Sequence, residues 1–144
     1  MPQSLSRIYV HLIFSTKNRQ RCIDAEVRSS LHAYLATVCR DQGCNAYRVG
    51  GTDDHVHAVC ALGRTTTVSK LVEHTKKVSS AWMKQRGERY LGFYWQRGYG
   101  AFSLSPSHLK EVIQYVDNQE VHHRKEGYQD ELRRFLKAYG IEYD

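Results

Sequence analysis

Residues 50–62 decide the fold: Gly50-Gly51-Thr52-Asp53-Asp54-His55-Val56-His57-Ala58-Val59-Cys60-Ala61-Leu62. The first five predict a turn, because Gly and Asp accept the backbone angles at which a chain reverses. The others predict a strand, on which successive side chains point to opposite faces. His55 and His57 therefore share one face. The opposite face is apolar and suits a core covered by helices; it consists of Val56, Ala58, Cys60 and Leu62.

The segments around this turn and strand predict strands and helices in alternation. On the N-terminal side they are a strand from Arg7 to Thr16, a helix from its cap Asp24 to near Gly43, and a strand from Asn45 to Val49. On the C-terminal side they are a helix from its cap Thr67 to before Gly87, a strand from Phe93 to Leu104, a helix from Ser107 to His123, and a shorter helix from Gln129 to Tyr139.

The first six elements have the βαββαβ order of a ferredoxin-like α+β sandwich. In that fold two helices pack on one face of an antiparallel sheet, and the other face stays available. A further C-terminal helix carries Tyr115. A chain of 144 residues has room for one core, so we predict a single domain over residues 1–144, with an appendage over about residues 124–144.

Basic residues are concentrated in the middle of the sequence. The whole chain has 21 Lys and Arg against 15 Asp and Glu, a net charge of +6. Residues 70–106 hold seven of the basic residues and two acidic ones, Glu73 and Glu88. This excess favours a polyanionic partner, although a solvated helix face explains part of the same pattern.

The beginning of the sequence has neither a long apolar run nor a small-residue cleavage site, which are the marks of a secretory signal. The apolar run from Ile8 to Phe14 contains His11 and is too short to cross a bilayer. We therefore expect a cytoplasmic protein without a membrane segment, whose four cysteines remain thiols.

Two imidazoles on one strand face suit a divalent cation as neutral nitrogen ligands. Paired histidines on a strand are also common as polar surface, so His55-Val56-His57 by itself leaves both interpretations open. His11 has the same parity as its neighbours Tyr9 and Ile13 on the first strand, and for it we favour a structural role over a place near a metal.

The helix that begins at Ser107 has an apolar stripe that should lie against the body of the protein. Tyr115 and Gln119 are four residues apart on one flank of that stripe, so a phenol and a carboxamide lie side by side at the edge of the core. An ordinary amphipathic tyrosine beside a solvated glutamine has the same spacing. The chain has ten tyrosines, and spacing alone does not single out Tyr115.

Four segments occur together over most of the chain: residues 10–17 (VHLIFSTK), 51–57 (GTDDHVH), 95–103 (WQRGYGAFS) and 113–119 (IQYVDNQ). In content and order they resemble the HUH-type single-tyrosine transposases of small bacterial insertion sequences. They also resemble the domesticated relatives of these enzymes that are associated with repeated extragenic palindromes (REP). The ending, residues 139–144 (YGIEYD), is similar to the family's tail.

This resemblance implies a metal-dependent transposase that cleaves and rejoins single-stranded DNA at hairpin-containing ends through a 5′-phosphotyrosine. It implies that His55, His57 and Gln119 hold one divalent ion, Mg²⁺ or Mn²⁺, and that Tyr115 is the nucleophile. A phosphotyrosine conserves the energy of the broken phosphodiester, so no nucleotide cofactor is required. The resemblance also implies a homodimer in which the tyrosine helix of one subunit can complete the site of its partner.

The expected partner is single-stranded or hairpin DNA. Lys and Arg neutralise phosphates, and aromatic rings stack on unpaired bases. The candidates for DNA contact are Lys17, Arg19, Lys76, Lys77, Arg97 and Tyr99.

Other functions fit the sequence less well. Cys39 and Cys44 with the histidine pair miss the usual ligand spacing of a zinc site at one end. A zinc deaminase needs His-x-Glu and Pro-Cys-x-x-Cys, and phosphoesterases with paired His-x-Ser/Thr motifs need two copies; the sequence has none of these. A non-catalytic nucleic-acid-binding regulator with the same fold stays an alternative, against which the intact set of four candidate site residues argues.

Overall fold

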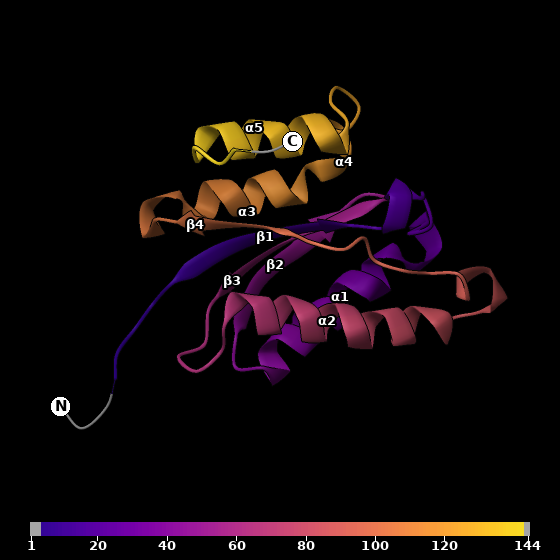
Figure 1. Ribbon diagram of the computed structural model, residues 1–144, viewed down its shortest axis with the longest axis horizontal. Coiled ribbons are helices and arrows are strands. Elements are labelled where there is room, and N and C mark those ends of the chain that lie inside the picture. Colours follow the sequence, from indigo (N-terminus) through magenta and orange to yellow (C-terminus); the bar gives the residue numbers. More distant parts are fainter. Residues whose placement is uncertain (1–3, 143–144) are drawn as a thin grey trace.

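A computed structural model of the chain describes residues 4–142 and shows an antiparallel sheet between two layers of helices (Figure 1). The strands are β1 (Tyr9–Ser15), β2 (Asn45–Gly51), β3 (His55–Ala61) and β4 (Gly100–Leu104). The α-helices are α1 (Ala25–Asp41), α2 (Val68–Lys84), α3 (Leu109–Asp117), α4 (Gln119–His122) and α5 (Tyr128–Ala138). The last two residues of the family-like tail, Tyr143 and Asp144, lie outside the described residues.

The sheet has the order β2-β3-β1-β4, and all neighbouring strands are antiparallel. This confirms the predicted α+β, ferredoxin-like sandwich. β3 lies in the interior of the sheet, between β1 and β2. Its residue His57 pairs with Ile13 of β1 on one side and with Gly50 of β2 on the other. The histidine pair is therefore held by strands on both sides.

Helices α1 and α2 cover the apolar face of the sheet, as the alternation of β3 predicts. Both begin at the predicted caps: the side chain of Asp24 accepts a hydrogen bond from the backbone N–H of Val27, and that of Thr67 accepts one from Lys70, each at 3.2 Å. Beneath them lies a core of buried apolar residues from the strands and helices, including Val10, Leu12, Leu71, Ala58 and Cys60.

The opposite face of the sheet, which the predicted two-helix sandwich leaves available, is covered by α3, α4 and α5 (Figure 1). All seven residues of β3 are buried as a result, and the side chains of His55 and His57 are 0% exposed. The histidine pair is thus part of a polar interior between sheet and helices. Among the described residues no helix has the length and apolar character needed to span a membrane.

Two predicted elements are shorter or more irregular than expected. The predicted strand from Phe93 is regular only as β4: Trp95 forms an isolated bridge with Thr16, and Gly98, with φ +89°, leaves extended geometry before β4 begins. The predicted helix over residues 107–123 begins with a 3-10 turn and is interrupted at Asn118, which has φ −99° and ψ 21°. The interruption separates Tyr115 on α3 from Gln119 on α4.

Candidate metal centre

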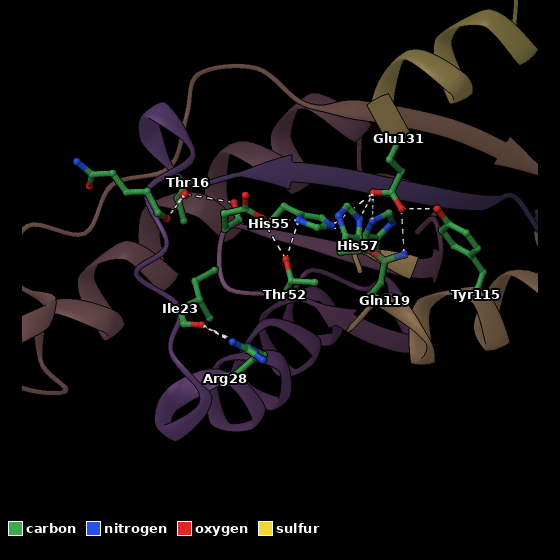
Figure 2. A network of polar contacts seen from close by, with 12 residues as sticks. Thr16, Ile23, Arg28, Thr52, His55, His57, Tyr115, Gln119 and Glu131 are labelled. Atoms are coloured by element: carbon green, nitrogen blue, oxygen red, sulfur yellow. Dashed lines mark hydrogen bonds and ion pairs between the residues drawn. The ribbon is translucent and has the colours of Figure 1, made fainter. Parts of the chain in front are cut away.

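His55 and His57 project from β3 into a buried cluster of polar side chains (Figure 2). The turn before β3 fixes His55: its Nδ1 lies 2.8 Å from Asp54 Oδ1 and 3.0 Å from Thr52 Oγ1. Gly51 permits this turn, because it has a φ of +153° and a Cβ there would lie 2.2 Å from the carbonyl oxygen of His55. With Nδ1 engaged by the turn, Nε2 of His55 faces the cluster.

His57 is oriented by a second histidine. Its Nδ1 lies 2.7 Å from Nε2 of His11 on β1, and its Nε2 faces the cluster, 2.9 Å from Glu131 Oε1. The structural role predicted for His11 therefore takes a definite form, since this residue fixes the ring of a predicted metal ligand. Histidines that bind metals are commonly oriented in this way through their second nitrogen.

Tyr115 and Gln119 reach the same cluster from the opposite side. Oε1 of Gln119 lies 2.9 Å from Nε2 of His55. The Tyr115 hydroxyl donates to Oε2 of Glu131, and the rings of Tyr115 and His57 have centroids 5.9 Å apart. All four side chains proposed from the sequence thus meet in one site, and all belong to one chain.

Glu131 lies at the centre of the cluster and was missed by the sequence reasoning. Glu131 is on α5 and is fully buried. Its Oε1 atom lies 2.9 Å from Nε2 of His57, 3.1 Å from Nε2 of His123 and 3.4 Å from Nε2 of His55. The sequence does contain a signal for it. Glu131 occupies the helical stripe between Tyr128 and Phe135, where an amphipathic helix ordinarily has an apolar residue.

Burial and charge set the pKa values of the histidines in opposite directions. Burial lowers the pKa of His57 to about 4, although Glu131 opposes this shift. Burial acts in the same sense on His55, but the contacts of His55 with Asp54 and Glu131 outweigh burial and raise the pKa of His55 to about 9. Burial alone would raise the pKa of Glu131, and the three neighbouring imidazoles instead hold it far below its usual range. The charged forms of Glu131 and His55 therefore favour each other.

The phenol of Tyr115 stands between a carboxylate and a guanidinium. Burial raises its pKa, and so does its hydrogen bond to Glu131. Arg134 opposes this shift, because its Nη2 lies 2.7 Å from the phenolic oxygen and its charge favours the phenolate. Arg134 is held in turn by Glu126, 2.8 Å away.

The donor set of the cluster fits a divalent metal ion. One ligand atom from each of His55, His57, His123 and Glu131 can be chosen so that all lie within 4.8 Å of one another. Imidazole nitrogens suit transition ions, and carboxylate and carboxamide oxygens suit Mg²⁺ and Mn²⁺. Gln119 adds such an oxygen at 2.9 Å from His55 Nε2. Two of the three predicted ligands, His55 and His57, therefore belong to a cluster that could hold a metal ion, and the third, Gln119, lies beside it.

Four of the six residues predicted to contact DNA line one cavity of about 550 Å³ between α2 and the segment before β4: Lys76, Lys77, Arg97 and Tyr99. Arg19 lines a neighbouring hollow that shares Gln96 with this cavity and extends to Tyr128, whose ring centroid is 4.9 Å from that of His55. Lys17 lines neither; its ammonium lies 5.9 Å from the centroid of the Tyr94 ring.

A ferredoxin-like sheet whose His-X-His strand faces a tyrosine-bearing helix is the arrangement that the sequence resemblance implied. The chain belongs to the IS200-like transposase family, whose model matches residues 4–119. No protein with a curated description matches the sequence.

Two solved structures are similar in fold. One, from Deinococcus radiodurans R1 and provisionally assigned as a transposase, is 21% identical with a TM-score of 0.63, over 83% of this chain and 98% of that one. The other is a REP-associated tyrosine transposase bound to a REP hairpin, 14% identical with a TM-score of 0.62, over 85% of this chain and 74% of that one. At these identities the likeness supports the fold.

Proposed function

We propose that this protein is a metal-dependent DNA transposase that cleaves and rejoins single-stranded DNA at hairpin-containing ends. The observation that carries the proposal is the convergence of His55, His57, Gln119 and Tyr115 in one site. Membership of the transposase family supports DNA as the substrate. The hairpin is suggested by the similar REP-associated protein, which was solved with hairpin DNA.

Tyr115 is the proposed nucleophile. Its phenolic oxygen attacks the scissile phosphorus, the bond from phosphorus to the 3′ oxygen breaks, and a 5′-phosphotyrosine and a free 3′-hydroxyl result. Arg134 favours the phenolate that forms, because its guanidinium is 2.7 Å from that oxygen. Rejoining is the same reaction in reverse, with a 3′-hydroxyl as the nucleophile, so no nucleotide cofactor is needed.

His55, His57 and Gln119 are the proposed ligands of Mg²⁺ or Mn²⁺. A bound divalent ion would polarise the phosphoryl oxygen and neutralise developing charge. His11 holds His57 through the Nδ1 atom of His57 at 2.7 Å, and Asp54 holds His55 through the Nδ1 atom of His55 at 2.8 Å. Both Nε2 atoms therefore face the same cluster. The strand thus contributes a fixed pair of ligands, and the helices contribute the carboxamide and the nucleophile.

The cavity between α2 and the segment before β4 is the proposed DNA-binding surface. Lys77 and Arg97 provide charge for phosphates, and Trp95 and Tyr99 provide rings on which unpaired bases can stack. Lys76 is partly committed to the structure, since its ammonium donates to two backbone carbonyls and burial lowers its pKa to about 8. The hollow with Arg19 and Tyr128 would lead the strand from this cavity toward His55.

A homodimer remains part of the proposal, since the resemblance to the transposase family implies one. One chain already brings the tyrosine and the three proposed ligands together, so exchange of α3 between subunits is not needed to assemble the site. Light scattering with and without hairpin DNA measures the assembly state. Mixing Tyr115→Phe with His57→Ala subunits tests exchange, because activity in the mixture requires a site built from two chains.

The proposed chemistry is tested by trapping a covalent adduct. Labelled single-stranded oligonucleotides that carry a hairpin and randomised flanks are incubated with the protein and Mn²⁺ and separated under denaturing conditions. We expect a metal-dependent adduct that Tyr115→Phe abolishes and Tyr34→Phe, on the far side of the sheet in α1, retains. An adduct that survives Tyr115→Phe would identify a different nucleophile. Tight DNA binding without any adduct, in Mn²⁺ or in Mg²⁺, would favour a non-catalytic regulator.

A further inference from the structure

Glu131 is the one carboxylate that is fully buried among residues 4–142. A carboxylate in such a place requires compensating charge or hydrogen bonds. Its two oxygens have different partners: Oε1 faces the Nε2 atoms of three histidines, and Oε2 accepts hydrogen bonds from the Tyr115 hydroxyl and from Gln119 Nε2, the latter at 3.1 Å (Figure 2).

The distances around Oε1 match those between ligands of one ion. Ligand atoms about 2.1 Å from a common cation, at octahedral or tetrahedral angles, lie about 3.0 to 3.4 Å from one another. Oε1 lies 2.9 Å, 3.1 Å and 3.4 Å from Nε2 of His57, His123 and His55. Direct hydrogen bonding explains the shortest of these contacts, and a shared ion explains all three.

His123 supplies an independent observation. Its Nε2 is buried and has no hydrogen-bond partner, although it lies 3.1 Å from Glu131 Oε1. The nitrogen is thus close to the carboxylate but not aligned with it, as expected for two ligands that are directed at a third point. Two other buried ring nitrogens among the described residues also lack a partner, Nδ1 of His11 and Nε2 of His32, but of the three only that of His123 lies beside a carboxylate oxygen, where a shared ion explains it.

We propose that Glu131 is a bridging ligand, with Oε1 on the ion and Oε2 on the Tyr115 hydroxyl, and that His123 is a further ligand of the same ion. This inference rests on the proposed function, because it concerns the same metal and the same nucleophile. The bridge sets the distance between them, so Glu131 is a positioning residue for Tyr115. His55, His57 and Gln119 would be the other ligands, so five protein side chains would hold the ion.

A different role for Glu131 makes the opposite prediction. If its carboxylate only balances the charge of the histidines while no ion is bound, it competes with the ion, and its removal should leave Mn²⁺ binding unchanged or make it tighter. If Glu131 is a ligand, its removal should weaken binding. Loss of an outer contact to a ligand typically costs 10- to 100-fold in metal affinity, and loss of a direct ligand should cost at least as much.

The test is Mn²⁺ binding to the full chain, measured by calorimetry and by the electron paramagnetic resonance of the bound ion. We expect Glu131→Gln to weaken Mn²⁺ binding by at least 10-fold and Asp130→Asn, an exposed carboxylate on the same helix, to leave it unchanged. Glu131→Asp keeps the charge but shortens the reach by one methylene, and should also weaken binding. If Glu131→Gln does not fold, Mn²⁺ binding by Glu131→Asp tests the proposal instead. Wild-type or tighter affinity in the folded Glu131 variants would overturn the proposal.

Two further measurements test the Glu131 bridge and the proposed metal site independently of each other. Even at saturating Mn²⁺, the rate of DNA adduct formation by Glu131→Gln should be at least 10-fold lower than that of the wild type, because Tyr115 has lost its link to the ion. An equal rate would refute the bridge. Tyr115→Phe should bind Mn²⁺ as the wild type does. If His57→Ala also binds Mn²⁺ undiminished, the metal site of the proposed function is wrong, whatever Glu131 does.

Discussion

Gly50 offers a way to move the nucleophile without touching it. The residue pairs with His57 across β2 and β3, and α3 lies directly over it. A Cβ at this position would lie 2.7 Å from the carbonyl oxygen of Val116 and 2.8 Å from its Cγ1, whereas ordinary contact begins at 3.4 Å. Because the closest atom is backbone, Gly50→Ala requires α3 to shift by about 0.7 Å, the difference between the two distances. Tyr115 directly precedes Val116 and must move with it.

A displacement of this size should be visible in the chemistry. Misplacing reacting groups by about 1 Å can cost about 100-fold in rate, so Gly50→Ala should slow single-turnover adduct formation by about 10- to 100-fold. That corresponds to about 1.4 to 2.7 kcal/mol in the activation free energy. The free energy of unfolding should fall by about 1–3 kcal/mol, as for other overpacked sites. Mn²⁺ affinity should fall less than the rate, because two of the ligands stay on β3.

Gly92→Ala is the matched control, since a Cβ there meets nothing within 4 Å. Adduct formation is followed in denaturing gels, and folding is checked by thermal unfolding monitored by circular dichroism. If Gly50→Ala forms the adduct within twofold of the wild-type rate and unfolds at the same temperature, the close packing of α3 on β2 does not determine the position of Tyr115.

Three other outcomes follow from the site and its surroundings. Tyr115→Phe should abolish the adduct but leave the affinity for hairpin DNA within about twofold in a gel-shift assay, because one hydroxyl is lost; strongly weakened binding would mean that Tyr115 holds DNA. Lys77→Met should weaken DNA binding and reduce the slope of log affinity against log salt by about 1, whereas Lys137→Met, on α5 across the sheet, should change neither. Burial lowers the pKa of His11 to about 3 and of His57 to about 4, so between pH 6 and 5 the unfolded chain takes up protons that the folded chain does not. Without metal the free energy of unfolding should therefore fall in that range by about 1.4 kcal/mol per pH unit for each histidine; urea unfolding in EDTA measures it, and a flat profile would show that these histidines are not buried in neutral form.

The fold could be predicted because its deciding signals are local. Asp24 and Thr67 cap helices through their own side chains, and the alternation over residues 55–62 fixes which face of β3 enters the apolar core. These features depend on neighbours a few residues away. The predicted last strand contains β4, but its irregular first part could not be predicted, because the bridge from Trp95 to Thr16 and the Lys76 contacts to Gln96 and Gly98 join residues far apart in the sequence.

The candidate site was predictable only in part, for a related reason. The strand period places His55 and His57 together, and the helical period places Tyr115 near Gln119. Family resemblance was needed to choose this tyrosine. The interruption at Asn118, which turns Gln119 into the interior, depends on how α3 and α4 pack on the sheet. No local pattern in the sequence fixes that packing.

The polar character of this interface is itself evidence for chemistry. Helices α3 to α5 need only apolar residues to pack against a sheet, and replacing buried charged groups by well-packed apolar ones is often neutral or stabilising. Yet the face of the sheet beneath these helices buries His11, His55 and His57, and the helices bury Gln119 and Glu131 against them. Stability gives no reason for five such side chains in one place, whereas the proposed metal site does, with His11 orienting His57 and the other four as ligands. The cluster is therefore better explained by what it holds during the reaction than by what it contributes to folding.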